Sequence, residues 1–304
     1  MKKKVLIASY DAGGAEILSN WLKYKKPKAF VVVDGPAKKI FKKNCPNIKF
    51  DKLDYALSKS DWVLCSTGWS SYFELNVLTK AKKLNKRSVA FLDHWVNYLD
   101  RFKSQNKKYI FPDEIWVGDL HAKKISTSIF NNIPVIQKKN PYFHHIILKI
   151  RSMKKKKKNK KLYKKVLYVS EPIEDHINLK NKLKKKFYYN EHDALRYFLR
   201  NLNQIDKNIK EITLRPHPSE KVNKYNWVKK FDKVKIKFSK NKSILEDISY
   251  SDIVVGCETM AMVIGLLGKK RVVTSIPPNK KSKINISLPY KEIEKIPELI
   301  NKDK

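Results

Sequence analysis

The chain has 304 residues, of which 67 are Lys or Arg and 29 are Asp or Glu, so its formal net charge is +38. This length suits two domains of ordinary size, and a hydrophobic content of 42% can fill two cores. No apolar run approaches the ~20 residues that span a bilayer, and the amino terminus passes directly from lysines into a strand, unlike a signal peptide. We therefore expect a cytoplasmic protein.

The positive charge is almost all Lys, with only seven Arg in the chain. Recognition of bases and phosphates favours the planar Arg side chain, so no specific nucleic-acid partner is expected, although a non-enzymatic nucleic-acid binder stays as a minor alternative. Two explanations of the lysines remain open. The lysines reflect a compositional bias on a solvated surface. Alternatively, lysine clusters such as residues 154–158 bind an anionic membrane face and make this a peripheral membrane protein.

The three cysteines are scattered and lack a CxxC spacing. This pattern predicts neither a disulfide framework nor a zinc site, and it is typical of a reducing cytosol.

Strand-like apolar runs alternate with amphipathic segments along the first half, which is the pattern of a parallel sheet covered by helices. The clearest helix is residues 71–84, with apolar side chains at helical spacing. The predicted strands are residues 4–9, 29–34, 62–66, 88–92, 114–117 and 134–137.

A lysine-rich stretch at residues 150–165 can bury almost nothing and is predicted to be a linker. A second α/β pattern follows, with helices at residues 192–202 and 259–267, the latter closed by Gly268 as a left-handed cap. The strands predicted here are residues 166–170, 211–214, 234–238, 252–256 and 271–275. The domains are then 1–149, an acceptor domain, and 166–304, a nucleotide-donor domain: two Rossmann-like α/β domains facing a cleft.

The stretch EITLRPHPSE places His217 between Pro216 and Pro218, directly after a predicted buried strand. Proline restricts the backbone on both sides, and ligands of open α/β sheets bind at the carboxyl ends of strands. His217 and Arg215 are therefore candidates to bind a phosphate. The alternative is a turn histidine with a satisfied hydrogen bond.

The first turn, SYDAGGAE, follows the first strand and opens a helix. Gly13 and Gly14 would let a ligand approach the backbone, and Asp11 is either a general base or the cap of the helix. The G-x-G-x-x-G spacing is absent, which makes a nicotinamide enzyme an unfavoured alternative although Asp34 ends the second strand.

The stretch FLDHWVNYLDRF places Asp93, His94, Trp95 and Tyr98 beyond another strand end. Acids and aromatic rings together suit sugars, because rings stack on pyranose faces. Trp95 and Tyr98 are equally compatible with a core position. His94 is the second candidate for the general base.

The block SDIVVGCETMAMVIGLLGKK predicts a strand, then Glu258, then a helix from Thr259. The N–H groups near Thr259 and Met260 would bind a phosphate, and Glu258 would accept ribose hydroxyls, unless this is an ordinary helix start. Ser170 and Glu171, at the end of strand 166–170, are expected on the same donor side.

The RPHP run and the later SDIVVGCETM block resemble the nucleotide-binding half of bacterial GT-B glycosyltransferases, the sialyltransferases and polysialyltransferases above all. They are also similar to CDP-glycerol glycerophosphotransferases. The resemblance implies that His217, Pro218, Glu258 and Thr259 hold the nucleotide of a CMP-sugar, such as a sialic-acid-type nonulosonate, and it favours inversion. Where those enzymes have an acidic pair before glycine, this chain has Asp11, Ala12 and Gly13.

These inferences together predict a metal-independent glycosyltransferase of cell-surface polysaccharide synthesis. Its substrates would be a nucleotide-sugar and a glycan or lipid-linked acceptor, without a further cofactor. Asp11 or His94 would deprotonate the acceptor, and His217 with Arg215 would stabilise the departing phosphate. A UDP-sugar 2-epimerase with the same two-domain architecture and a CDP-glycerol-type phosphotransferase are the alternatives.

Overall fold

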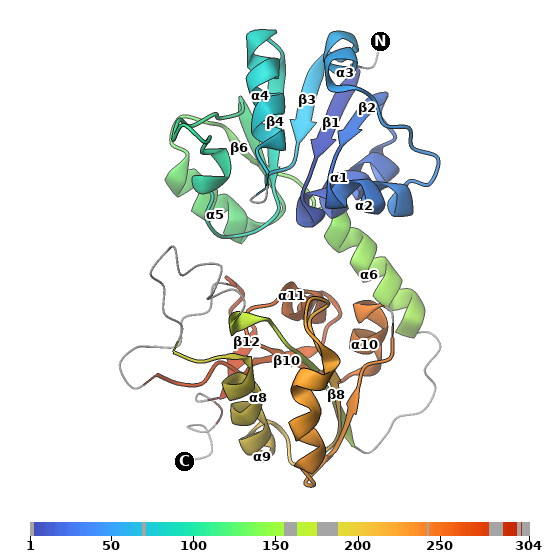
Figure 1. Cartoon of the computed structure of the whole chain (residues 1–304), viewed down its shortest axis with the longest axis vertical. Coiled ribbons are helices and arrows are strands. Elements are labelled where there is room, and N and C mark those ends of the chain that lie inside the picture. The colour runs from blue at the N-terminus through green and yellow to red at the C-terminus, as the bar shows by residue number, and fades with distance from the viewer. Residues whose placement is uncertain are drawn as a thin grey trace. The chain divides into compact units, whose positions relative to one another are not determined.

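The computed structural model describes residues 3–68, 71–154, 163–174, 188–241, 243–279, 288–296 and 299. The chain forms two compact units, Met1–His145 and Ile146–Lys304, and the division falls within helix α6 (Pro141–Lys154) (Figure 1). Of the stretch predicted as a linker, residues 150–154 belong to α6, and β7 begins at Lys164. Residues 155–162, and with them most of the lysine cluster 154–158, lie outside the described residues.

The first unit is a six-stranded sheet in the order β2-β1-β3-β4-β5-β6, with every neighbouring pair parallel. The carboxyl ends of all six strands therefore meet at one edge of the sheet. The strands are β1 (Val5–Ser9), β2 (Ala29–Val33), β3 (Trp62–Cys65), β4 (Arg87–Leu92), β5 (Glu114–Val117) and β6 (Val135–Gln137). The helices are α1 (Ala12–Lys25), α2 (Pro36–Asn44), α3 (Leu53–Lys59), α4 (Phe73–Lys83) and α5 (Leu120–Ile129), with a 3-10 turn at Asp100–Phe102.

The second unit is a six-stranded parallel sheet in the order β12-β11-β10-β7-β8-β9. Its strands are β7 (Lys164–Val169), β8 (Ile209–Arg215), β9 (Lys235–Phe238), β10 (Ile253–Gly256), β11 (Arg271–Thr274) and β12 (Ile293–Lys295). Its helices are α8 (Glu191–Arg200), α9 (Leu202–Ile205), α10 (Ile244–Tyr250) and α11 (Met260–Leu267), with a 3-10 segment, η3 (Val222–Lys230). The prediction of two Rossmann-like α/β domains is confirmed.

All eleven predicted strands are present, with ends within two residues of the predicted ones, because continuous Val and Ile runs mark strands buried on both faces. The twelfth, β12, was not predicted. Two of its three residues are charged, and the apolar positions of EIEKI are too few to separate a strand from a turn.

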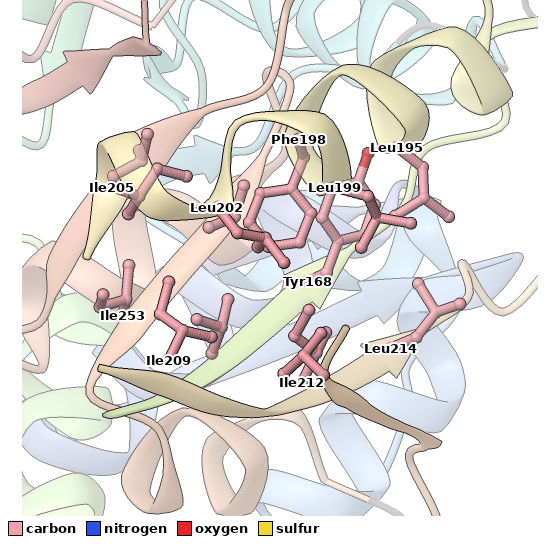
Figure 2. Close-up of a cluster of buried hydrophobic side chains, with 14 of the residues drawn as sticks. Tyr168, Leu195, Phe198, Leu199, Leu202, Ile205, Ile209, Ile212, Leu214 and Ile253 are labelled. Carbon is pink, nitrogen blue, oxygen red and sulfur yellow. The ribbon is translucent and has the colours of Figure 1, made fainter. Parts of the chain in front are cut away.

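One face of the second sheet packs against α8, as Figure 2 shows. Leu195, Phe198 and Leu199 recur at helical spacing on α8, and the ring of Phe198 stacks on Tyr168 of β7 with 5.2 Å between centroids. Full burial of such a side chain is worth about 1.5–3 kcal/mol, so this cluster holds β7 and β8 firmly in place. The loops at their carboxyl ends are thereby attached to a rigid base.

The prediction of a left-handed Gly268 is wrong, because its φ is −77° and the left-handed residue is Lys269, with φ of 55°. Lys270 N–H donates to Gly265 O and Lys269 N–H to Leu266 O, the two bonds of a Schellman ending. That motif places the left-handed conformation one residue after the helix cap. Gly268 instead provides room, since a Cβ there would lie 3.3 Å from Ile150 Cδ1.

Candidate functional site

Strand β7 lies between β8 and β10, so the segments that follow these three strands meet at one edge of the second sheet. Ser170 and Glu171 follow β7, His217 follows β8, and Glu258 with Thr259 follows β10. The structure therefore brings together the donor-side residues that the sequence predicted from separate motifs. Gly256 makes this close approach possible, since a Cβ there would lie 2.9 Å from Val169 Cγ2.

His217 is exposed, and its backbone is fixed by two hydrogen bonds. Its N–H donates to Ser170 Oγ (3.1 Å) and to Glu220 Oε2 (3.0 Å). Its Nδ1 accepts the N–H of Ser219 at 3.3 Å, and Ser219 Oγ lies 2.7 Å away. Because Nδ1 is an acceptor of a backbone N–H, the neutral ring carries its proton on Nε2, an assignment made from these hydrogen bonds. The adjoining Pro218 is also exposed.

Glu220 anchors the His217 loop through hydrogen bonds. The sequence did not identify Glu220 as a site residue. Its side chain has no exposed surface and accepts hydrogen bonds from Ser170 Oγ, the His217 N–H, Tyr225 Oη and Lys224 Nζ. Burial opposes its ionisation, but the hydrogen bonds from Ser170, Tyr225 and His217 outweigh burial and lower the pKa of Glu220. The only sequence signal was an acid three residues after the histidine.

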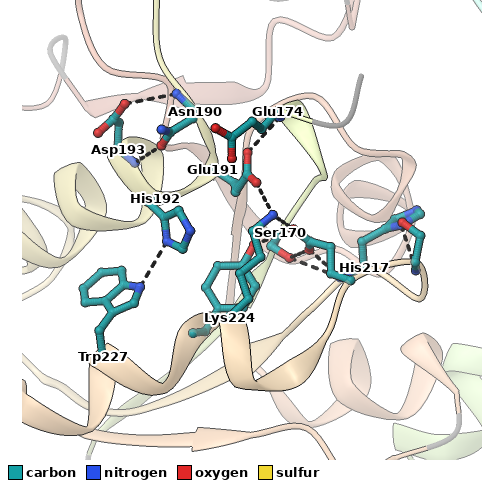
Figure 3. A network of polar contacts seen from close by, with 12 residues as sticks. Ser170, Glu174, Asn190, Glu191, His192, Asp193, His217, Lys224 and Trp227 are labelled. Carbon is teal, nitrogen blue, oxygen red and sulfur yellow. Dashed lines mark hydrogen bonds and ion pairs between the residues drawn. The ribbon is translucent and has the colours of Figure 1, made fainter. Parts of the chain in front are cut away.

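The network continues away from the loop through Lys224, as Figure 3 shows. Lys224 Nζ also pairs with Glu191, a carboxyl with 1% side-chain exposure on α8, and Glu191 Oε2 accepts the N–H of Glu174 at 3.0 Å. Neighbouring hydrogen bonds join Asn190 to Asp193 in a capping box at the start of α8 and Trp227 to His192. The histidine loop is thus anchored to α8 as well as to β7.

On the other side of β7, Glu171 Oε2 accepts the N–H of Glu258 at 2.9 Å. Burial, with the nearby Glu258 and Glu220 carboxylates, raises the pKa of Glu171 to about 7, although the Glu258 N–H bond opposes the rise. Thr259 caps α11, its Oγ1 accepting the N–H of Ala261 at 3.3 Å. The predicted phosphate-binding segment therefore begins a helix at Met260.

Arg215 does not have the surroundings predicted for a phosphate ligand. Alternate residues of β8 point to opposite faces, and Arg215 points toward α10, where Nη1 lies 2.6 Å from Asp247 Oδ2 and donates to Asn241 O at 2.8 Å. The Asp247 side chain is only 2% exposed, so its charge requires a partner. Arg215 therefore neutralises a buried acid.

Three glycines let the loops after β1, β3 and β4 pack against one another in the first unit. A Cβ on Gly13 would lie 2.2 Å from Asp93 Oδ2, one on Gly14 would lie 2.2 Å from Ser66 Cβ, and one on Gly68 would lie 2.8 Å from Asp11 Oδ2. Asp11 occupies the N-cap position of α1, but its side chain makes no capping hydrogen bond. The structure thus brings Asp11, Gly13 and Asp93 to one edge of the first sheet.

Asp93 pairs with a buried cation and lies next to the second candidate base. Arg101 Nη1 lies 2.6 Å from Asp93 Oδ1 and donates to Thr67 Oγ1 at 2.9 Å. Burial and the charge of Arg101 lower the pKa of His94, while Asp93 opposes this, so the net direction is downward. His94 is accordingly neutral at neutral pH.

Trp95 and Tyr98 are core residues rather than a sugar-stacking surface. They are 4% and 1% exposed, Trp95 Nε1 donates to Asp119 Oδ2 at 3.0 Å, and the Tyr98 ring stacks on Phe130. A ring covered in this way cannot stack on a pyranose. The core position that the sequence left open is the one observed, because both side chains contact residues at the ends of α5.

Glu74, near the start of α4, is a second carboxyl that sequence analysis missed. It is 3% exposed, and its Oε1 accepts the N–H of Tyr10 at 2.8 Å and Ser66 Oγ–H at 2.9 Å. Burial raises the pKa of Glu74, the hydrogen bonds from Tyr10 and Ser66 oppose the rise, and the charge of Asp11 adds a smaller contribution in the same direction as burial. An acid on the buried face of a predicted helix was the signal that could have identified it.

No cluster of three or more His, Cys, Asp or Glu side chains suited to a metal ion occurs in the part of the chain that the structure describes. None of the helices within the described ranges is long and apolar enough to cross a membrane.

No protein-family model and no curated protein matches this sequence. The structure is similar to UDP-GlcNAc 2-epimerase from Methanocaldococcus jannaschii, with a TM-score of 0.60 and 14% identity over 89% of this chain and 83% of that one. It is similar to a putative UDP-N-acetylglucosamine 2-epimerase from Listeria monocytogenes (TM-score 0.58, 10% identity, 90% and 79% covered). It is also similar to UDP-N-acetylglucosamine 2-epimerase from Rickettsia bellii, with a TM-score of 0.52 and 11% identity over 92% of this chain and 80% of that one. At such identities the likeness shows a shared fold, the pair of Rossmann-like domains of GT-B-like proteins.

Proposed function

We propose that this protein binds a nucleotide-sugar at the carboxyl edge of its second sheet and transfers the sugar to a glycan or lipid-linked acceptor. The observation that carries the proposal is the His217 loop, held by the buried Glu220 and by Ser170 beside the start of α11. A surface turn needs no buried carboxylate beneath it. A loop that must present one imidazole in a fixed direction does.

In this proposal His217 donates Nε2–H to a donor phosphate oxygen, and the N–H groups at the start of α11 contribute the partial positive charge of a helix N-terminus. Glu258 and Glu171 accept hydrogen bonds from ribose hydroxyls. The His217 Nε2–H and the N–H groups at the start of α11 would stabilise the negative charge of the leaving phosphate. For this reason the scheme needs no metal ion.

Asp11 is the proposed base, and His94, kept neutral by burial and by Arg101, is the competing one. A positioned base is worth roughly 10² to 10⁴ in rate. The resemblance of the RPHP and SDIVVGCETM segments to sialyltransferases supports a CMP-sugar as donor and inversion at the anomeric carbon. The lysine excess supports a further proposal, attraction of the enzyme to an anionic membrane face where lipid-linked acceptors lie.

The test is calorimetric titration of the protein with CMP, CDP, UDP, GDP and NAD. Selective binding of a cytidine nucleotide, weakened at least about tenfold (~1.4 kcal/mol) by His217→Ala, is the expected result. His121→Ala, on α5 of the first unit, is the matched control and leaves the affinity unchanged. Absence of nucleotide binding in the parent protein would overturn the proposal.

A UDP-sugar 2-epimerase is the second candidate, favoured by a fold likeness that extends over 89% of the chain. The two functions separate cleanly, because an epimerase changes a UDP-sugar with no acceptor present. Incubation with UDP-GlcNAc alone, followed by proton NMR of the sugar ring, distinguishes them: a new C2 epimer supports the epimerase, and unchanged substrate with selective cytidine binding supports the transferase.

A further inference from the structure

Glu74 has a buried carboxyl group in which one oxygen has hydrogen-bond partners and the other has none among the described residues. Oε1 accepts two hydrogen bonds, from the Tyr10 N–H and from Ser66 Oγ, and Ser66 Oγ lies 2.8 Å from Ser9 Oγ. Oε2 is buried and has no hydrogen-bond partner among the described residues. An ionised carboxylate oxygen left without a donor in a buried place is costly, whereas a protonated one is not.

The unsatisfied oxygen faces a second carboxyl across Gly68. A Cβ built on Gly68 would lie 2.8 Å from Asp11 Oδ2 and 3.3 Å from Glu74 Oε2, so both oxygens border the space that this glycine leaves. Two like charges so placed disfavour each other, and the more deeply buried group takes the proton. Glu74, at 3% exposure, is the more buried of the two.

The other titratable groups nearby do not reverse this outcome. Cys65, at the end of β3, is buried, and burial raises the pKa of its thiol, so it remains neutral. Asp93 approaches from the loop after β4, and its charge is paired with Arg101. His94 beside it has a lowered pKa and carries no charge to offset a second carboxylate.

We infer that Glu74 and Asp11 form a coupled carboxyl pair in which Glu74 holds a proton on Oε2 and Asp11 carries the single negative charge. The inference rests on the proposed function for the role of Asp11 as base, and it makes Glu74 a positioning residue. A neutral Glu74 places no second negative charge beside the Asp11 carboxylate that is to accept the acceptor proton.

The proton balance follows from this assignment. The acceptor O–H bond breaks, its proton passes to Asp11, and the oxygen forms a bond to the anomeric carbon. The bond from that carbon to the donor phosphate oxygen breaks, and its electron pair leaves on the phosphate. The proton on Glu74 is retained throughout.

The pair is tested without any substrate, so failure of the proposed function cannot be confused with failure of this inference. The full chain is labelled with ¹³C at the Glu side-chain carboxyl carbon and titrated by NMR, and the signal of Glu74 is assigned by its loss in Glu74→Gln. We expect Glu74 to titrate at higher pH than the other glutamates of the first unit, and Asp11→Asn to move that titration to lower pH. Glu16→Gln, a carboxyl on α1 that bonds Asn44, is the control and leaves the Glu74 signal unchanged.

A titration of Glu74 in the ordinary glutamate range, or one unmoved by Asp11→Asn, would overturn the pairing. If Glu74→Gln does not fold, Gly68→Ala provides the second variant, because its methyl group must separate the two carboxyls. The signal is then identified in the parent protein as the glutamate signal that Asp11→Asn moves to lower pH, and we expect Gly68→Ala to shift that same signal in the same direction.

Discussion

Glu171 accepts the backbone N–H of Glu258 at 2.9 Å, and this bond connects the end of β7 to the residue before the cap of α11. Glu171 also follows Ser170, which accepts the His217 N–H, so one short segment contacts both halves of the candidate donor site. A change of charge on Glu171 is therefore expected to reach the whole site.

The first prediction concerns the pH dependence that Glu171 imposes. Its pKa is raised from an ordinary 4.5 to about 7 in the folded protein, so its contribution to stability is complete below about pH 4.5 and is lost as pH rises through about 7. We expect Glu171→Gln to raise the thermal midpoint at pH 8 and to leave it nearly unchanged at pH 4. Calorimetric scans at both values measure this, with exposed Glu292→Gln as control. Equal effects at the two pH values would contradict it.

The second prediction concerns Glu220. Glu220→Gln leaves Lys224 with Glu191 alone and weakens the bonds to the His217 N–H and Ser170, so we expect a loss of about 3 kcal/mol in the free energy of unfolding. Because the pKa of Glu220 is lowered in the folded state, its contribution to the free energy of unfolding is present above the pKa of the unfolded chain. That contribution is lost as pH falls through the pKa of the folded state. Urea unfolding at pH 7 and pH 4 measures both effects. Ser219→Ala removes the hydroxyl that lies 2.7 Å from His217 Nδ1 and leaves Glu220 in place, so it separates loss of the ring contact from loss of the anchor. The same stability in Glu220→Gln and the parent protein at pH 7 would argue against the anchoring role.

The third prediction separates a structural Arg215 from a ligand-binding one. Arg215→Ala strands the buried Asp247 carboxylate, which costs about 3–5 kcal/mol. The double variant Arg215→Ala with Asp247→Ala should recover part of that loss, because no buried charge remains unpaired. Urea unfolding of the single and double variants provides the measurement. An Arg215→Ala protein of unchanged stability that has lost nucleotide affinity would restore the phosphate role predicted from the sequence.

The fourth prediction tests the packing of the first unit. The methyl group of Gly13→Ala would lie 2.2 Å from Asp93 Oδ2 and force that carboxyl away from Arg101, which we expect to cost about 1–3 kcal/mol. Ala12→Ser, at the adjacent exposed position, is the control. Thermal unfolding of both variants supplies the comparison. A Gly13→Ala protein with the stability of the parent would show that Asp93 can move without a loss of stability.

The strands and their alternation with helices followed from the sequence because they depend on local patterns. Continuous Val and Ile runs predict strands buried on both faces, and that pattern located β1 and β10 within a residue. The ending of α11 escaped prediction because the left-handed residue of a Schellman motif is set by hydrogen bonds that include Lys270, and a glycine nearby was misleading.

The sequence by itself determined the two α/β domains, the loop of His217 between two prolines and the acid and glycines after β1. Tertiary structure decided which charges meet. It paired Arg215 with Asp247, placed Glu220 beneath His217, buried Trp95 and Tyr98, and brought Glu74 toward Asp11. The physical reason is that periodicity reports which face of an element is buried, whereas the partner of a buried polar group depends on strand order and loop packing between residues far apart in the chain.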